Sequence, residues 1–250
     1  GFDGALPGFE VAGLGRVDLL ANLSARRGAG GGAGSGALMI DGTARATMRR
    51  LDNEFLRTLA GGLPVVTSGI AIGPDGVVRF SNLRVTSPLL TLNGAGIRRA
   101  DGTFQLSGRG AHRRYGPVVV SLDGPIDRPR TTVRLANPLP AAQLSDVELQ
   151  LIPSATGFAF TSTGGSMLGP YQAAGQINLP RGRGAVIDIQ RLAVGGTVAR
   201  GQLVVAQGGL AGQLLVGGGG LDGSIILSVP GGIQRVVARL TARDARFSGP

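Results

Sequence analysis

The chain has 250 residues, 45 of them glycine, and a formal net charge of +10 whose basic part is entirely arginine, because lysine is absent. A composition with no cysteine and one histidine excludes disulfide frameworks, thiol catalysis and His-rich metal clusters. The glycines follow no three-residue period, which excludes collagen, and no stretch of about 18 apolar residues predicts a membrane-spanning helix.

The N-terminal part predicts two strands, a loop and a helix. Alternation of apolar and polar residues predicts strands over 17–25 and 37–49. Between them, residues 26–36 contain two arginines followed by Gly, Ala and Ser, a composition typical of a flexible loop. Residues 52–60 predict one short helix, because an Asp-Asn pair can cap it, its apolar residues share one edge and a glycine follows it.

From residue 65 onward the sequence predicts almost unbroken strand and turn. Further strands are expected over 77–85, 89–93, 104–107, 118–122 and 132–136, with about fifteen in the whole chain. Gly-rich turns separate them at hairpin spacing, which favours antiparallel neighbours because parallel strands need long crossovers. We therefore predict an all-β fold: an elongated, curled antiparallel sheet with one short helix, in which residues 1–250 form a single solenoid-like β-groove.

The alternation is strictest in the C-terminal half. Successive side chains on a strand point to opposite faces, so Phe158 and Phe160 share one face and Ala159 and Thr161 share the other. The same rule, applied to every strand after residue 146, predicts one continuous apolar face. The residues expected to line it are Val147, Leu149, Leu151, Phe158, Phe160, Ile177, Leu179, Ile187, Ile189, Leu203, Val205, Leu214, Val216, Ile225, Leu227, Ala238 and Leu240.

No pattern in the chain predicts an enzyme. Gly218, Gly220 and Gly223 match a dinucleotide-binding spacing, but such a site needs a following helix and a strand is expected there. His112 lies in a basic stretch that predicts a solvated turn, and the carboxylates lie mostly in Asp-Gly turns. We expect no catalytic residue, no metal, no cofactor and no small-molecule substrate.

The basic charge favours two interpretations equally. Arginine in place of lysine is typical of GC-rich coding, and it also suits attraction to anionic surfaces. The arginines are spread over most strands and loops, and 8 Phe and 2 Tyr without Trp offer few platforms for stacking bases. We therefore expect no nucleic-acid partner.

The apolar face leaves two functional hypotheses open. In the first, the sheet is a trough open along one seam that solvates lipid tails, with arginines such as Arg235 and Arg239 attracting headgroup phosphates. In the second, the chain is a structural or adhesive secreted β-solenoid, resembling an autotransporter passenger, with a closed and packed core. Alternation alone predicts both.

Several segments resemble the AsmA-like TamB family, the inner-membrane subunit of the bacterial translocation and assembly module. The likeness is carried by the order and spacing of short turns rather than by one motif. It includes Ser-Pro-Leu-Leu-Thr-Leu-Asn-Gly at 87–94, Tyr-Gly-Pro at 115–117, Gly-Pro-Ile-Asp-Arg-Pro at 124–129 and Val-Gly-Gly-Thr at 194–197. It covers residues 76–250 well and the first 75 weakly.

The resemblance implies a long β-taco groove in the periplasm of a Gram-negative bacterium, in a protein anchored to the inner membrane. It implies phospholipid transport between the inner and outer membranes in support of outer-membrane protein translocation and assembly. The partners it implies are phospholipid acyl chains and an outer-membrane barrel protein. The family's anchor helix and C-terminal domain have no counterpart in these residues, so we expect a fragment of a longer protein whose barrel contacts lie elsewhere.

Overall fold

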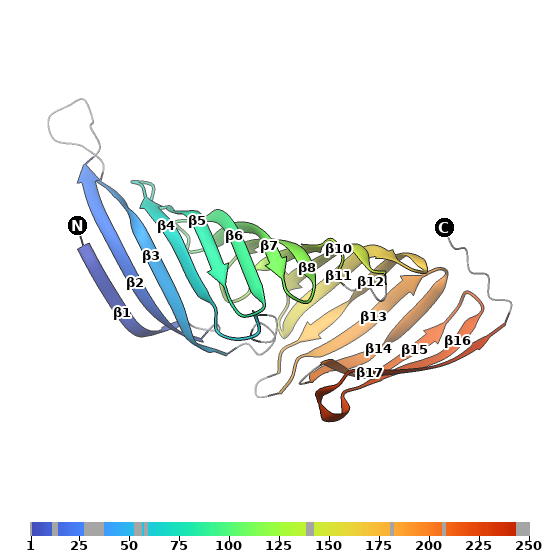
Figure 1. Cartoon of the computed structure of the whole chain (residues 1–250). Helices are drawn as coiled ribbons and strands as arrows, with labels where there is room; N and C mark the ends of the chain where they lie inside the picture. Colours follow the sequence, from blue (N-terminus) through green and yellow to red (C-terminus); the bar gives the residue numbers. More distant parts are fainter. Residues whose placement is uncertain are drawn as a thin grey trace. The chain divides into compact units, whose positions relative to one another are not determined.

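The computed structural model describes residues 2–11, 15–27, 38–52, 57, 60–138, 143–180, 183–206 and 209–243. Within them the fold is nearly all-β, with seventeen strands and a 3-10 turn at Pro230–Gly232 (Figure 1). The chain divides into two compact units, Gly1–Thr131 and Thr132–Pro250, called unit 1 and unit 2 below.

Unit 1 is a meander in which each strand pairs antiparallel with the next along the chain. Its strands are β1 (Phe2–Val11), β2 (Gly15–Arg27), β3 (Leu38–Leu51), β4 (Val65–Ile72), β5 (Val78–Thr86), β6 (Leu90–Arg98), β7 (Phe104–His112) and β8 (Gly116–Gly124). β9 (Arg130–Leu135) crosses the boundary between the units.

Unit 2 continues the same antiparallel plan. Its strands are β10 (Ser145–Pro153), β11 (Gly157–Ser166), β12 (Gly169–Asn178), β13 (Val186–Val194), β14 (Thr197–Ala206), β15 (Gly209–Gly217), β16 (Leu221–Ser228) and β17 (Arg235–Ala242). Hairpin turns short enough to reverse the chain directly join most of them, because glycines such as Gly195 and Gly196 adopt the positive φ that these turns need.

The sheet is open and thin within each unit. Among the described residues, the first and last strands of each unit do not pair with one another. The chain exposes 15036 Å² of surface, whereas two compact globules of half its mass would together expose about 12,400 Å². No described side chain is less than 2% exposed. A layer one sheet thick accounts for both observations.

The predicted all-β, antiparallel, open architecture is confirmed. The sequence missed β1, whose alternation is interrupted at Pro7 and Gly8, where the β1–β2 register shifts. Arg26 and Arg27 end β2 rather than beginning the loop expected over 26–36, and the rest of that loop lies outside the described residues. The helix expected over 52–60 also lies largely outside them, although Arg57 and Ala60 are helical. A single groove over 1–250 stays a prediction.

Candidate functional site

The candidate site is one face of unit 2, and the strand register assembles it. Leu151 of β10 is opposite Phe160 of β11. Two residues along β11 and on the same face, Phe158 is opposite Ile177 of β12, and Ile177 is opposite Ile187 of β13. Because directly opposite residues share a face of the sheet, the first four strands of unit 2 contribute to one surface.

The last four strands extend that surface. Ile187 is opposite Leu203 of β14, and Leu214 of β15 is opposite Ile225 of β16, which is opposite Ala238 of β17. By strand register and alternation, all seventeen residues that the sequence predicted for the groove lie on this one face. We call the set the apolar face.

The apolar face is continuous from β10 to β16. One cluster is centred on Leu151, Phe160 and Ile177, and a second on Leu203 and Leu214. Ile187 and Ile189 pack against both clusters and join them. Of the predicted members, only Val147, Ala238 and Leu240 lie outside the two clusters.

No charged side chain lies on the apolar face of strands β10–β17, according to their register. Its polar side chains include Ser162 and Tyr171, whose hydroxyl groups hydrogen-bond to each other at 3.1 Å. That bond gives each hydroxyl group one partner on the apolar face itself.

Charged side chains on the strands of unit 2, such as those of Glu148, Asp188 and Arg200, lie on the opposite face. Glu148 accepts hydrogen bonds from the Gln150 amide and the Arg134 guanidinium, both at 2.8 Å. These two donors stabilise the carboxylate, and they lower the pKa of Glu148. Arg235 and Arg239 are opposite Ser228 and Ser224, so they also lie on the polar face, away from the apolar side chains.

Burial changes along the apolar face. Leu203, at its centre, is 4% exposed, whereas Leu240 and Val236, on the same face of β17, are 44% and 59% exposed. Every member of the two clusters belongs to unit 2, so the unit covers the centre with its own side chains. At β17 the apolar face emerges into solvent.

Glycines on the apolar face make room for its large side chains. Gly175 is opposite Phe160, and a Cβ there would lie 2.8 Å from the Phe160 ring. Gly201, opposite Leu214, has φ +156, and an added Cβ would collide with the carbonyl oxygen of Gln213. Such residues allow a sheet to curve toward the face on which they lie.

A cavity of about 180 Å³ opens at the β11–β12 hairpin end of the apolar face. Leu192, Val216 and Ile225 line its inner side, and the exposed hairpin residues Met167 and Leu168 border it. A dry cavity of about 150 Å³ lined by aliphatic side chains binds benzene. This one therefore has the size and lining for a short piece of hydrocarbon.

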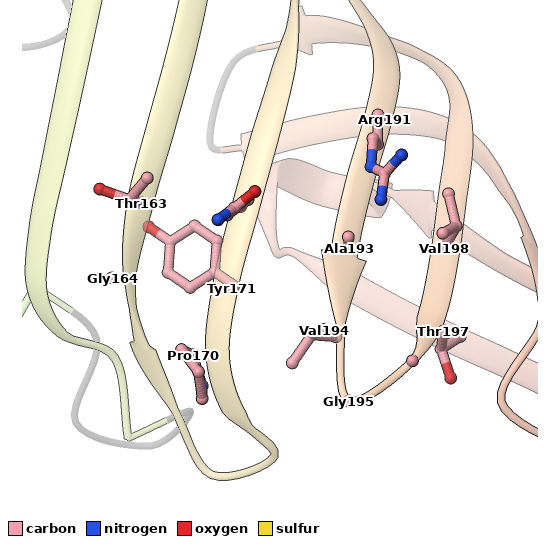
Figure 2. A pocket seen from close by; sticks show the side chains of 12 residues that line it. Thr163, Gly164, Pro170, Tyr171, Arg191, Ala193, Val194, Gly195, Thr197 and Val198 are labelled. Carbon is pink, nitrogen blue, oxygen red and sulfur yellow. The ribbon is translucent and has the colours of Figure 1, made fainter.

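A second hollow, of about 470 Å³, lies by the hairpin ends of β11–β12 and β13–β14 (Figure 2). Thr163, Ala193 and Val198, on the polar face, line it together with Tyr171 from the apolar face. Arg191 stands above it and contributes its one charged group. This hollow is separate from the two apolar clusters.

Because of a β-bulge, strict alternation did not predict part of the apolar face. The register on both sides of β13 shifts at Gln190 and Arg191, which together occupy the place of one residue. The shift puts Leu192 and Val194 on the same face as Ile189, although strict alternation would put them on the other. In the sequence the bulge shows as two consecutive polar residues, Gln190 and Arg191, which separate Ile189 from Leu192 and break the alternation.

His112 corrects another expectation. The predicted solvated turn begins one residue later, and His112 itself is 3% exposed at the end of β7. Its Nδ1 accepts hydrogen bonds from the backbone N–H groups of Arg114 and Tyr115 at 3.1 and 3.3 Å, and its ring stacks on Tyr115. The histidine therefore anchors the β7–β8 turn.

The described residues hold neither a metal-binding cluster nor a membrane-spanning helix. They contain no group of three or more His, Asp or Glu side chains arranged to hold a metal ion. Nor do they contain a helix with the length and apolar content needed to cross a bilayer.

Comparisons of the chain with protein-family models, with curated proteins and with solved structures gave no match.

Proposed function

We propose that this chain is a periplasmic part of a TamB-like, inner-membrane-anchored protein, and that its apolar face carries phospholipid acyl chains between the two membranes. Lipid delivered in this way would support outer-membrane protein assembly. The observation that carries the proposal is the apolar face: it contains no charge from β10 to β17, it is continuous through Ile187 and Ile189, and it ends exposed on β17.

The energy of exposed hydrocarbon makes such a surface useful. Burying a methylene group contributes about 0.8 kcal/mol, so two acyl chains of about sixteen carbons exposed to water cost on the order of 20 kcal/mol. A continuous aliphatic surface removes most of that cost at every position along it. Because its lining has no polar anchor in the two clusters, a chain can slide rather than stop in one pocket.

Entry of a chain would begin where apolar atoms are already accessible. Leu240 lines the cavity beside the β11–β12 hairpin, and its side chain is also among the exposed ones of β17. The centre, around Leu203, is covered by the unit's own side chains. Transport therefore requires the sheet to open at the centre as a chain passes.

The covered centre of the apolar face favours a second candidate function. Side chains 4–9% exposed at Leu203, Leu214 and Phe160 are what a closed structural β-solenoid would also have. In that case the chain is an adhesive or spacer element, and the apolar face is its core. The two functions differ in whether lipid enters.

Lipid content of the purified chain distinguishes them. We expect native mass spectrometry to find phospholipid on the wild-type protein and little on Leu240→Arg, which puts a charge on the exposed end of the apolar face. The matched control is Leu215→Arg: Leu215 is 63% exposed and opposite Ser224 on the polar face. That variant should keep its lipid.

A wild-type protein without lipid, even after mixing with phospholipid vesicles, would support the closed solenoid. Equal lipid on both arginine variants would also contradict the proposal, because lipid would then be held elsewhere. Circular dichroism of the variants checks that the sheet is intact.

A further inference from the structure

A row of arginines crosses the middle of the polar face of unit 1. The register sets Arg45 of β3 opposite Thr67 of β4, and Thr67 opposite Arg84 of β5. Arg84 is opposite Asn93 of β6, which is opposite Arg109 of β7. Since opposite residues share a face, the three arginines occupy alternate strands along one line, which we call the arginine row.

The three arginines of the row are exposed and have no carboxylate partner in the described part of the chain. Other arginines of unit 1 are paired: Arg49 with Asp18 at 2.6 Å, and Arg79 with Asp75 at 2.6 Å. Arg27, Arg113 and Arg130 likewise have no carboxylate partner among the described residues, so what distinguishes the row is its alignment across β3, β5 and β7.

The neighbouring positions add hydrogen-bonding groups but no negative charge. From β3 to β7, the two flanking lines of the polar face contain Thr43, Thr47, Val65, Gly69, Ser81, Thr86, Thr91, Ala95, Ser107 and Ala111. The acids closest in register lie on β1 and β2, and both are engaged. Asn22 donates to Asp3 at 2.5 Å, and Gly8 N–H donates to Asp18 at 2.8 Å.

A hollow of about 680 Å³ lies beside the first arginine of the row. Asn22, Thr43 and Thr67 line it together with Arg45, with Asp3, whose carboxylate accepts the hydrogen bond from Asn22, and with small residues of the other face such as Ala44. The sheet is thus recessed where the Arg45 guanidinium and two threonine hydroxyl groups lie near one carboxylate that is already hydrogen-bonded.

We propose that the arginine row binds an extended, phosphate-bearing polymer that runs across the strands of unit 1. Neighbouring strands lie about 4.8 Å apart, so the three guanidinium groups recur about every 10 Å in a line one residue wide. Such a line suits a linear polyanion, and the guanidinium fork is well matched to phosphate oxygens. Thr67 and Asn93 stand between the arginines and can donate to intervening oxygens.

The aromatic residues argue that phosphates, not bases, are recognised. Phe80 and Phe104 lie on the other face of unit 1, where their rings stack 6.3 Å apart. The polar face from β3 to β7 therefore offers no ring on which a base could stack, and stacking is the usual means of holding single-stranded nucleic acid.

Inorganic polyphosphate is the probe for this site. We expect the 250-residue chain to bind it with an affinity that falls as salt rises, because binding releases counterions. The triple variant Arg45→Gln, Arg84→Gln, Arg109→Gln should bind at least about tenfold more weakly at 0.1 M salt, with a log–log salt slope lower by about 2, as expected for three lost phosphate contacts. Calorimetry measures both quantities.

The matched control removes the same charge from unit 2, by Arg200→Gln, Arg235→Gln and Arg239→Gln. It should keep most of the affinity, since all three positions are exposed and lie off the row. Equal losses in the two triple variants would overturn the proposal, as would a wild-type chain that fails to bind polyphosphate. So would a row variant that loses binding to anionic phospholipid vesicles but not to polyphosphate, because the partner would then be a membrane surface.

Discussion

Units 1 and 2 have the same antiparallel plan but differ in the side chains that their faces carry. In unit 2 the apolar face has large aliphatic side chains opposite one another, as at Ile187 and Leu203. In unit 1 the face opposite the arginine row also has large pairs, such as Ile70 opposite Phe80, but small residues line its middle, where Ala44 is opposite both Ala21 and Ser68. Side-chain volume along the middle of the face, not backbone topology, therefore distinguishes unit 2, with its two joined clusters, from unit 1, whose cluster is centred on Val17, Met48 and Leu51.

The polar faces of the two units differ in the charge along their central lines. Unit 1 has three aligned arginines in the middle of its sheet, whereas a central line of unit 2 contains Gln176, Asp188, Gln202 and Gln213. Each unit thus has one face rich in a single chemistry, hydrocarbon in unit 2 and guanidinium in unit 1. Substitutions that treat the two units differently test this comparison.

The largest effect is expected from a charge at the centre of the apolar face. Leu203→Asp should destabilise unit 2 by about 4 kcal/mol or more, because Leu203 is 4% exposed and an unpaired buried carboxylate adds a desolvation penalty to the lost packing. Ala44→Asp, at a half-buried position bordering the unit 1 hollow, should cost less than half as much. Urea denaturation measures both, and equal costs would contradict the difference in packing.

A smaller difference in stability is expected between alanine substitutions at two glycines with positive φ. Gly201→Ala should cost about 2 kcal/mol or more, because its Cβ would collide with the neighbouring strand in addition to the strained backbone. Gly116 has φ +72 with nothing within 4 Å of an added Cβ, so Gly116→Ala should cost only about 1 kcal/mol. Thermal unfolding of the two variants gives the comparison, and a larger loss at Gly116 would count against it.

The smallest effect is expected in the pH dependence of stability, at Asp18 near the β1–β2 edge of unit 1. The Gly8 N–H, together with the Arg49 guanidinium, lowers the pKa of Asp18. A carboxylate whose pKa is lower when folded stabilises the fold above its unfolded pKa, and that contribution is lost as pH falls through the folded pKa. The wild type should therefore be more stable than Asp18→Asn at about pH 6 and lose this advantage by about pH 2. An advantage unchanged over that range in thermal unfolding would contradict the assignment.

Period-two alternation predicted the apolar face well, because each of its strands keeps parity over the residues concerned. Ile187 and Ile189, for example, are separated by one polar residue and meet Leu203 and Gly201 across the ladder. The prediction failed where a bulge resets the parity, and so it omitted Leu192. It also missed β1, since Pro7 and Gly8 interrupt the pattern that the strand continues on both sides.

The arginine row could not be predicted from the sequence. Each arginine is one polar position on its own strand, and only the register shows that Arg45, Arg84 and Arg109 align. That register depends on turn lengths and on the bulge at Asn82, where φ is +50. The sequence does not encode the alignment in any local pattern.

One measurement tests the central claim, that acyl chains occupy the apolar face of unit 2. A photo-crosslinking amino acid is placed at Val216 or at Leu215, neighbours on β15 whose side chains point to opposite faces. Val216 also lines the apolar cavity. With phospholipid vesicles present, the account predicts lipid adducts at Val216 and none above background at Leu215. Equal adducts at both positions, or adducts at Leu215 alone, would contradict it.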